Sequence, residues 1–456
     1  MFVKLNIPRA LTIAGSDSGG GAGIQADLKT FAAFGVHGMC AITAVTAQNT
    51  VNVSGMQTIK PEVVALQIKS VVSDIGVDVI KTGMLHNSDI IQAMAKEIRK
   101  IHVPLVVDPV IVSKNGSNLL EEEAVPTIIK ELFPLATVVT PNLLEAEILV
   151  DFKIKTVDDA KHAASVICEM GPKATVVKGG HLEIGKMVTD VLCYNGETKS
   201  FVGNRITESN THGTGCTFAS AIAANIAIKN EIVVSVANAK NFVEESIRNS
   251  LKVGGGSGPV NPLGYVYREF MKQQIITNLL SAIELLEKDS HFAFLIPECQ
   301  SNIAMSLPFP TSFQDIAAIP GRIVKIVNRV KASSYPLFGA SHHLASTLLV
   351  VSRHNPDVKA VINIRYTEKI VDSIHTLHFS SSSYNRLDEP ESIKNVEGAS
   401  TKWGAEQAIK SAGFVPDVIF HRGDMGKEPM ILVLGQNAID VATKALKIAN
   451  VCVSSD

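Results

Sequence analysis

The segment THGTGC at 211–216 combines glycine, hydroxyl and thiol groups directly before an apolar stretch that predicts a helix. A Gly-rich turn that enters a helix leaves backbone N–H groups of the first turn unpaired, so it can cradle an anion. Gly213 and Gly215 allow the backbone to approach a phosphate closely. Cys216 falls in the first turn, where the helix dipole favours negative charge, so we expect a lowered pKa for its thiol. This segment alone also fits a helix entry packed through small residues, with Cys216 as a small core hydrophobe.

Further chemistry-bearing side chains stand at or just after the ends of apolar runs: Asp108, Asn142, Glu145 and Lys178. Two carboxylates and a lysine beside a Gly-rich anion turn are what a phosphoryl transferase needs, since they anchor a metal phosphate and neutralise the transferred charge. A second Gly-rich stretch lies at 14–29 between a predicted strand and helix. It lacks both the GK[ST] ending of a Walker A loop and the GxGxxG spacing of a dinucleotide site.

The composition excludes several classes of function. Of the 456 residues, 42 are Lys or Arg and 44 are Asp or Glu, so no basic excess supports binding to nucleic acid or anionic membranes. Six scattered cysteines without a CxxC motif indicate neither a disulfide framework nor a zinc site. The longest apolar run is too short for a membrane span, and the N-terminus does not resemble a signal peptide. We therefore expect a cytoplasmic homo-oligomer with small-molecule substrates and no nucleic-acid or membrane partner.

The first half alternates short apolar runs with helical patterns, which is typical of an α/β fold with a doubly wound, mainly parallel sheet and helices on both faces. Strands are expected at 10–15, 39–47, 77–83, 104–110, 136–142 and 174–180, and helices at 23–34, 61–73, 88–100, 119–131, 156–168, 214–228 and 231–249. An Asn-Gly turn predicts a hairpin at 187–206. Ligands of such sheets bind beyond the carboxyl ends of the strands, where the polar residues above stand.

Residues 253–265 are dense in Gly and Pro, which predicts a loop and a domain boundary. An amphipathic helix at 268–288 and a second series of elements follow, without a repeat of the first half. Strands are expected at 291–297, 302–308, 322–330, 358–366, 417–423 and 430–435, helices at 340–353, 400–412 and 436–448, and a polar loop at 381–392. The second half is therefore predicted to be a separate α/β domain.

The first half resembles the hydroxymethylpyrimidine/phosphomethylpyrimidine kinases of thiamine biosynthesis, within the ribokinase-like superfamily. The motifs are AGSDSGGGAGIQADLKTF, TAVTAQNT, KTGML, VVDPV, TPNLLEAE, VVKGGH and THGTGCTFASAIAA, in order over residues 8–262, and GSGPVNPL matches the family's end. The resemblance implies a kinase domain at 1–265 that uses ATP as co-substrate with Mg2+. Its substrate would be 4-amino-5-hydroxymethyl-2-methylpyrimidine, phosphorylated to the monophosphate and then to the diphosphate.

The same resemblance implies roles for individual residues. Gln48 suits the aminopyrimidine edge because an amide donates and accepts at once. The other implied substrate contacts are Gly15, Asp27 and Met84, and the implied ATP-binding positions are Asp108, Asn142, Glu145, Lys178, Gly213 and Gly215. Asp108 and Glu145 would hold Mg2+, mainly indirectly.

Cys216 occupies the place where many ribokinase-like enzymes carry an aspartate base. We hypothesise that it accepts the proton of the substrate hydroxyl. Alternatives stay open for other members: Met84 as plain core, Asp27 as a charge on a helix surface, and His181 and His212 as solvated loop residues.

The second half concentrates Gly, Arg and His around strand ends. Arg322, Arg365 and Lys427 have the chemistry to bind phosphate, and Ser341 is a plausible N-cap for a second anion-binding helix start. From the residues alone, this is a possible phosphate-binding α/β domain.

GRIVKIVNRV, FGASHHLA, INIRY, the WG at 403–404, PDVIFHRGDMGKEPM and LVLG resemble the ThiN-type thiamine-phosphate synthase domain, here at 270–456. The resemblance implies coupling of the pyrimidine diphosphate to 4-methyl-5-(2-phosphoethyl)thiazole, with release of pyrophosphate. Arg322 and His343 match the catalytic positions, and their division of labour with the adjacent His342 stays open. A ligand-sensing regulatory role for this domain is the alternative, and a kinase for pyridoxal or another vitamin alcohol is a third interpretation.

Overall fold

The computed structural model describes residues 7–112, 119–180, 187–206, 210–308, 310–394, 399–424 and 426–454. The chain divides into two compact units, Met1–Tyr267 and Arg268–Asp456, which are described separately. Among the described residues, none of the helices has the length and apolarity needed to cross a membrane.

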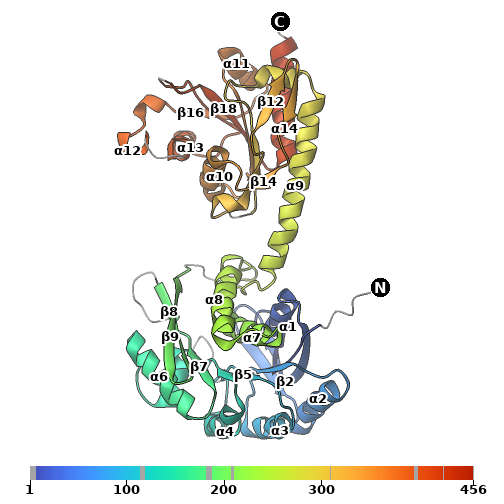
Figure 1. Cartoon of the computed structure of the whole chain (residues 1–456), viewed down its shortest axis with the longest axis vertical. Helices are drawn as coiled ribbons and strands as arrows, with labels where there is room; N and C mark the ends of the chain where they lie inside the picture. The colour runs from blue at the N-terminus through green and yellow to red at the C-terminus, as the bar shows by residue number, and fades with distance from the viewer. Residues whose placement is uncertain are drawn as a thin grey trace. The chain divides into compact units, whose positions relative to one another are not determined.

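The first unit is built on a nine-stranded sheet (Figure 1). Its strand order is β3 (Val53–Thr58), β2 (His37–Gln48), β1 (Arg9–Asp17), β4 (Val79–Thr82), β5 (Leu105–Val107), β6 (Val138–Val139), β7 (Ala174–Val177), β8 (Met187–Tyr194) and β9 (Glu197–Asn204). The strands from β2 to β7 are parallel, and β3, β8 and β9 run antiparallel to their neighbours. Strands buried on both faces explain the nearly continuous apolar runs of the sequence.

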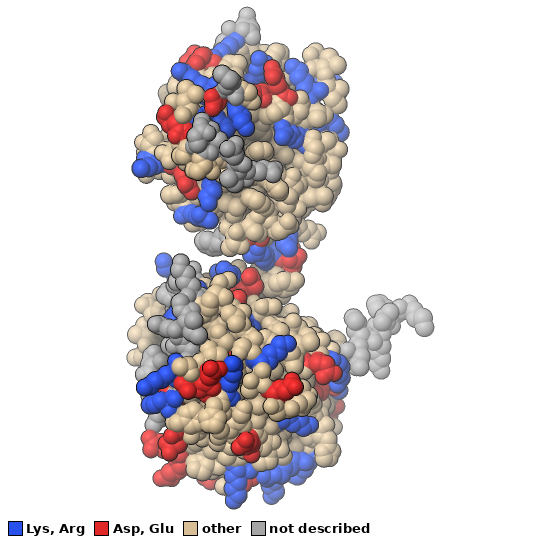
Figure 2. Space-filling model, turned by 60° about the vertical axis from the view of Figure 1, so that its left-hand side comes forward, with Lys and Arg blue, Asp and Glu red and all other residues tan. Residues whose placement is uncertain are grey.

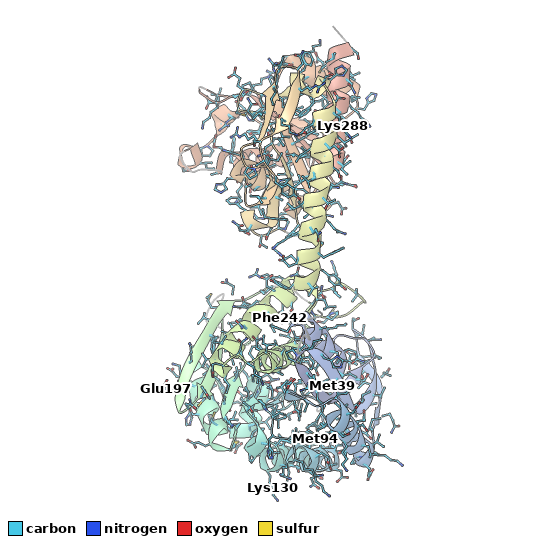
Figure 3. All side chains as sticks on the ribbon, turned by 45° about the vertical axis from the view of Figure 1, so that its right-hand side comes forward. Met39, Met94, Lys130, Glu197, Phe242 and Lys288 are labelled. Carbon is cyan, nitrogen blue, oxygen red and sulfur yellow. The ribbon has the colours of Figure 1, made fainter. Side chains whose placement is uncertain are left out.

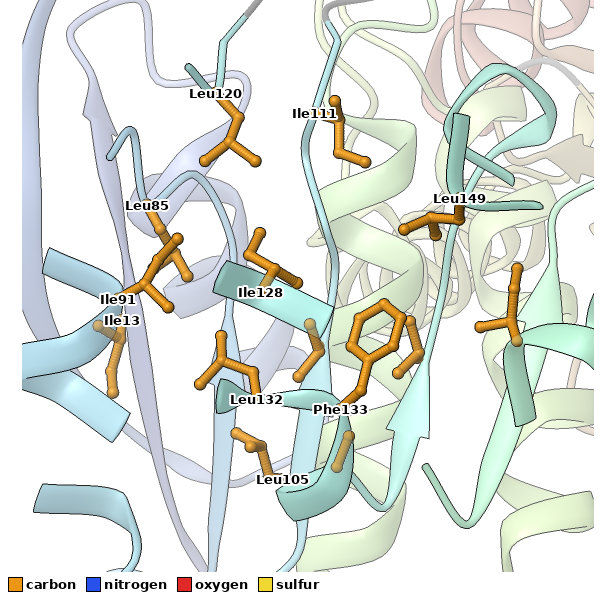
Figure 4. Packing of buried hydrophobic residues seen from close by; sticks show 14 of the residues in the cluster. Ile13, Leu85, Ile91, Leu105, Ile111, Leu120, Ile128, Leu132, Phe133 and Leu149 are labelled. Atoms are coloured by element: carbon orange, nitrogen blue, oxygen red, sulfur yellow. The ribbon is translucent and has the colours of Figure 1, made fainter. Parts of the chain in front are cut away.

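Helices cover both faces of this sheet, as predicted. One apolar core lies beneath α2 (Pro61–Asp74), α3 (Ser88–Ile98), α4 (Val125–Glu131), α5 (Leu143–Val150) and α6 (Val157–Glu169), and the other beneath α1 (Gly23–Ala33), α7 (Thr214–Ala227) and α8 (Ile232–Arg248). Successive residues of a strand serve opposite cores, since Leu11 packs in the first and Ala10 in the second. Figure 4 shows the first core, where Phe133 and Leu132 pack beside Leu105. Side chains such as Met94 lie inside this unit, whereas Glu197 lies at its surface at the start of β9 (Figure 3).

Two elements of the first unit were not predicted. The edge strand β3 is exposed along most of its length and so lacks an apolar pattern. Helix α5 lies within TPNLLEAE and begins with a capping box between Asn142 and Glu145, a start signal that is present in the sequence.

The helix expected at 119–131 is a short 3-10 turn, Glu122–Ala124, followed by α4.

The second unit has a seven-stranded sheet in the order β14 (Leu337–Phe338), β11 (Ile316–Ala318), β10 (Ile303–Ser306), β15 (Ala360–Arg365), β18 (Met430–Gly435), β17 (Val418–His421) and β16 (Ser381–Ser383). All pairs are antiparallel except β16 with β17. One face packs against α10 (His342–His354) and α13 (Ala399–Ala412), and the other against α9 (Gly264–Lys288), α11 (Glu368–Thr376) and α14 (Ala438–Ser454).

Three expectations for the second unit are wrong. Residues His291–Leu295 form a 3-10 helix instead of a strand, because a short apolar run does not distinguish a buried strand from a buried helical turn. The strand expected at 322–330 is a hairpin of β12 (Ile323–Ile326) and β13 (Arg329–Ala332). The loop expected at 381–392 contains β16 and the start of α12 (Glu391–Lys394).

Candidate active site

The N-terminus of α7 brings the two Gly-rich segments of the first unit together. Gly213 caps α7 with φ of 82°, and a Cβ there would lie 1.8 Å from the carbonyl oxygen of Gly21. Only glycine combines this backbone conformation with this close approach. A Cβ on Gly215 would lie 3.4 Å from Lys178 Nζ and 3.8 Å from Asp108 Oδ2. The first turn of α7 therefore faces a cation and a carboxylate.

Lys178, Asp108 and Glu145 form a buried charged cluster at this turn. Lys178 Nζ donates to Asp108 Oδ1 over 3.0 Å, and the Glu145 carboxylate accepts the backbone N–H groups of Ile111 and Asn142 at 3.1 and 2.8 Å. Burial raises the pKa of Glu145 to about 7, against the attraction of Lys178 and with the repulsion of Asp108. Burial disfavours the Lys178 ammonium, yet the two carboxylates raise its pKa above the ordinary value. The structure thus unites four of the positions singled out in the sequence, with Asn142 as the N-cap of α5.

The expectation of a lowered pKa for Cys216 is wrong. Desolvation of the thiolate raises the pKa of Cys216 to about 11, and the opposing effect of Lys81 is smaller. A helix terminus lowers a thiol pKa only where the thiolate keeps contact with water or with enough positive charge. Whether Cys216 acts as the base stays a prediction.

Asp27 is not a charge on a helix surface, because it is completely buried in a polar network. Both its oxygens accept from Lys81 Nζ at 2.9 Å, and Thr12 and Ser220 donate their hydroxyl groups over 2.6 Å. Burial disfavours the Lys81 ammonium, yet Asp27 raises the pKa of Lys81 above its ordinary value. These contacts join α1 to β1, β4 and α7. Direct contact of Asp27 with a substrate stays a prediction.

Three predicted substrate contacts surround the end of β1. A Cβ on Gly15 would lie 2.5 Å from Cε of the partly buried Met84, so these two residues touch. Gln48, at the end of β2, is partly exposed, and its main chain and the Ser18 hydroxyl exchange two hydrogen bonds of 2.7 and 2.8 Å.

Asp17 and His212 are residues of this site that the sequence reasoning missed. The buried Asp17 carboxylate accepts backbone N–H groups from Gly19, Gly21 and Ala22 at 2.8 to 3.0 Å. These bonds fix the conformation of the Gly-rich loop at 14–29. His212 Nε2 lies 3.1 Å from Asp17 Oδ2, so His212 is not a solvated loop residue. The signal for Asp17 was present, since an aspartate before a Gly-rich turn commonly binds the following N–H groups. His181 lies outside the described residues.

Part of the predicted interdomain loop packs against the same site. His212 N–H donates to the Gly258 carbonyl at 3.2 Å, and Val260 N–H donates to the His212 carbonyl at 3.0 Å. Residues 258–260 therefore complete the first unit.

The second unit has a cavity of about 320 Å3 at one end of its sheet. Its lining residues are Asn302, Ile319, Gly321, Arg322, Ala340, Ser341, His342 and His343. Arg322 has φ of 74° and donates to the Cys299 carbonyl, and His342 stacks on Phe313 with ring centroids 5.0 Å apart. The structure brings together Arg322 and His343, as the sequence analysis expected of one site.

Other predicted groups of this unit behave differently. Ser341 is the N-cap of α10, but its side chain makes no capping hydrogen bond. Arg365 and Lys427 do not line the cavity. On the face shown in Figure 2, acidic and basic side chains of the described residues intermingle, so that face has no broad basic patch.

Comparisons with known proteins cover both units. A family model described as phosphomethylpyrimidine kinase matches residues 17–261, and one described as thiamine-phosphate synthase ThiN matches residues 278–447. The hydroxymethylpyrimidine/phosphomethylpyrimidine kinase of Synechococcus elongatus is 44% identical over 264 residues, which are 58% of this chain and 99% of the relative. The thiamine biosynthesis bifunctional protein ThiED of Geobacter sulfurreducens is 47% identical over 252 residues, which are 55% of this chain and 51% of the relative.

A solved structure also resembles the first unit. The pyridoxal kinase of Bacillus subtilis, solved as an ADP complex, is 38% identical with a TM-score of 0.54. The match covers 57% of this chain and 99% of the kinase.

Proposed function

The chain belongs to the phosphomethylpyrimidine kinase family and carries a ThiN domain behind its kinase domain, and on this premise we propose its substrates and site residues. It is a bifunctional enzyme of thiamine biosynthesis, an ATP-dependent kinase and a thiamine-phosphate synthase. Residues 1–265 phosphorylate 4-amino-5-hydroxymethyl-2-methylpyrimidine to the monophosphate and then to the diphosphate. Residues 270–456 couple the diphosphate to 4-methyl-5-(2-phosphoethyl)thiazole and release pyrophosphate.

The kinase assignment depends most on the juxtaposition of Gly215, Lys178 and Asp108 at the start of α7. The unpaired N–H groups of the first turn stabilise the transferred phosphoryl group, and the Lys178 ammonium neutralises charge on the ATP phosphates. Cys216 lies in the same turn and accepts the proton that the substrate hydroxyl loses. Gln48, Gly15 and Met84 contact the pyrimidine, and Asp27 holds α1, β4 and α7 around it.

The donor set at this site fits Mg2+. The ion commonly binds one or two carboxylates together with substrate phosphates and keeps several waters. Asp108 and Glu145 supply two carboxylates, but both Glu145 oxygens already accept backbone N–H groups, which favours contact through water. Bound there, Mg2+ would neutralise charge that develops on the phosphates.

The cavity of the second unit supplies the groups for the synthase step. Arg322 presents a permanently charged guanidinium, suited to paired phosphate oxygens, on the same cavity as the N-terminus of α10. These groups stabilise the leaving pyrophosphate, with His343 as a hydrogen-bond donor. The division of roles between His343 and His342 stays open.

Phosphorylation of pyridoxal is a second candidate activity, favoured by the similarity to a pyridoxal kinase. Incubation of the whole protein with ATP, Mg2+ and either alcohol, followed by mass analysis, distinguishes the two. We expect both phosphates of the pyrimidine at a higher kcat/KM than pyridoxal phosphate. Higher kcat/KM for pyridoxal would contradict the proposed substrate.

We also propose a homo-oligomer located in the cytoplasm. The edge strand β3 and the bend before it expose apolar side chains, since Val51, Val53 and Met56 keep 65%, 51% and 44% of their surface accessible. Such a patch favours contact with a second copy. Six free cysteines fit a reducing compartment. Sedimentation equilibrium tests the oligomer, and a monomer mass at all concentrations would exclude it.

A further inference from the structure

The ring of His212 has a fixed position beside the Gly-rich loop at 14–29. Its main chain makes the two hydrogen bonds to Gly258 and Val260 described above. A Cβ on Gly21 would lie 2.5 Å from His212 Cδ2 and 2.9 Å from Pro259 Cβ, so the ring packs against Gly21, which also lies next to Pro259. Its Nε2 therefore has a defined position, 3.1 Å from Asp17 Oδ2 and 3.2 Å from Nε2 of Gln48.

The contacts of Asp17 determine whether Nε2 of the His212 ring carries a hydrogen. Apart from His212, Asp17 Oδ1 accepts the backbone N–H of Gly19 and Oδ2 accepts those of Gly21 and Ala22, so both oxygens act as acceptors. Burial opposes ionisation of this carboxyl, but hydrogen bonds hold the pKa of Asp17 below its usual value. An ionised carboxylate only accepts hydrogen bonds. His212 Nε2 must therefore carry a hydrogen that it donates to Asp17.

This hydrogen constrains the Gln48 amide. Because the two ends of a planar amide have the same shape, hydrogen bonding decides which one faces His212. With the amide nitrogen toward His212, two donors would oppose each other. With the amide oxygen there, it accepts a second contact from the Nε2 hydrogen.

The contact of the other end of the Gln48 amide with Thr46 is compatible with the amide oxygen toward His212. Gln48 Oε1 lies there, 3.3 Å from Thr46 Oγ1, and the single Thr46 hydroxyl hydrogen has a shorter contact with the Ser16 carbonyl, at 2.9 Å. The Thr46 hydroxyl is then available as an acceptor, so it can receive an N–H from Gln48. With the amide oxygen toward His212, each hydrogen-bond donor in the series Asp17, His212, Gln48 and Thr46 faces an acceptor.

We propose that His212 is a positioning residue that fixes the order in which the Gln48 amide presents its acceptor and donor to the substrate. This inference depends on the proposed function, in which Gln48 meets the edge of the aminopyrimidine. That edge offers an exocyclic N–H donor beside a ring-nitrogen acceptor. In the 4-oxo analogue, 5-hydroxymethyl-2-methylpyrimidin-4(3H)-one, a carbonyl acceptor stands beside a ring N–H donor, so the order is reversed. His212 thus selects the amino over the oxo pyrimidine.

The test compares kcat/KM for the two pyrimidines in the whole protein. His212→Phe keeps an aromatic ring against Gly21 but removes the Nε2 hydrogen. The Thr46 hydroxyl can donate to the amide oxygen or accept from the amide nitrogen, so without His212 the Gln48 amide can turn over and serve either edge. We expect the amino-to-oxo ratio to fall by about tenfold or more, because mismatched buried hydrogen bonds carry the discrimination. His212→Gln, which retains an N–H donor, should recover part of the ratio. His162→Phe is the matched control, because His162 is an exposed α6 residue that stacks on Phe152.

The outcomes separate this inference from the proposed function. An unchanged ratio in His212→Phe, with wild type active on the aminopyrimidine, would overturn the inference alone. Failure of wild type to phosphorylate the aminopyrimidine would overturn the proposed function and this inference with it. Thermal stabilisation by a non-hydrolysable ATP analogue verifies that the Phe variant is folded. If it is not, the same ratio is measured in His212→Ala, which relieves the packing against Gly21, and the same two results decide.

Discussion

Burial determines the protonation of two groups in or beside the first turn of α7, the proposed phosphate site. The Cys216 thiol has a pKa of about 11, so almost all of it is protonated at neutral pH. The Glu145 carboxyl has a pKa of about 7, so its charge changes within the physiological range. We therefore expect two separate pH effects on the kinase reaction, one from each group.

If Cys216 is the base, kcat/KM must follow its thiolate. Well below the pKa of about 11, the thiolate fraction rises about tenfold for each pH unit, so kcat/KM of wild type should rise similarly between about pH 8 and pH 10. Cys216→Ala should lose more than about tenfold in kcat/KM and also lose this pH dependence. A loss below tenfold would exclude the base role.

The Glu145 titration predicts a pH-dependent demand for Mg2+. As pH falls through about 7, the carboxyl gains a proton and its attraction for the ion disappears. The half-saturating Mg2+ concentration of wild type should therefore rise between about pH 8 and pH 6. Glu145→Gln should need more Mg2+ at both values, with little remaining change. An identical pH dependence in this variant would show that another group is responsible.

At the scale of elements, the site exists because loops and helices distant in sequence share buried polar contacts. The Lys81–Asp27 pair ties β4 to α1 across 54 residues, and the His212–Asp17 contact spans 195 residues. Removing Lys81 leaves the buried Asp27 carboxylate without its compensating charge, and removing His212 costs Asp17 one of its hydrogen-bond donors. The packing of these elements therefore depends on both members of each pair.

Lys81→Met should destabilise the kinase domain by about 3 to 5 kcal/mol, because it leaves the fully buried Asp27 carboxylate unpaired. The double variant Lys81→Met with Asp27→Asn should recover a large part of that loss. The thermal transition that a non-hydrolysable ATP analogue shifts reports on this domain. A single variant as stable as wild type would contradict the buried pair.

Gly213→Ala should remove kinase activity and lower the same thermal transition. The new Cβ would meet the Gly21 carbonyl oxygen at 1.8 Å with φ of 82°, so the two Gly-rich loops must separate. Gly255→Ala is the control, because a Cβ there meets nothing within 4 Å. Equal effects of the two substitutions would disprove the role of this contact.

Much of the first unit could be predicted because each apolar run is a complete local signal. The parallel strands and the helices between them follow from periodicity, and Gly213, Gly215 and Cys216 follow from one Gly-rich helix start. The contacts of Asp27 and His212 could not be read in this way, since their partners are far away in sequence. The 3-10 helix at His291–Leu295 was missed because its short apolar run fits a buried strand equally well. The pKa of Cys216 was misjudged because desolvation depends on the tertiary fold.

At the scale of the whole molecule, each compact unit has its own proposed anion site at a helix start. In the first unit it is α7 with Lys178, and in the second it is α10 with Arg322. The proposed product of the first unit is the substrate of the second. Fusion therefore supplies the two activities in equal amounts.

One incubation tests this account most directly. The whole protein is mixed with 4-amino-5-hydroxymethyl-2-methylpyrimidine, ATP, Mg2+ and 4-methyl-5-(2-phosphoethyl)thiazole, and every product is followed by mass analysis. We predict that wild type forms thiamine phosphate, whereas Arg322→Ala accumulates the pyrimidine diphosphate with at least about a hundredfold less thiamine phosphate. Accumulation of the diphosphate by wild type, without any thiamine phosphate, would contradict the synthase activity of the second unit.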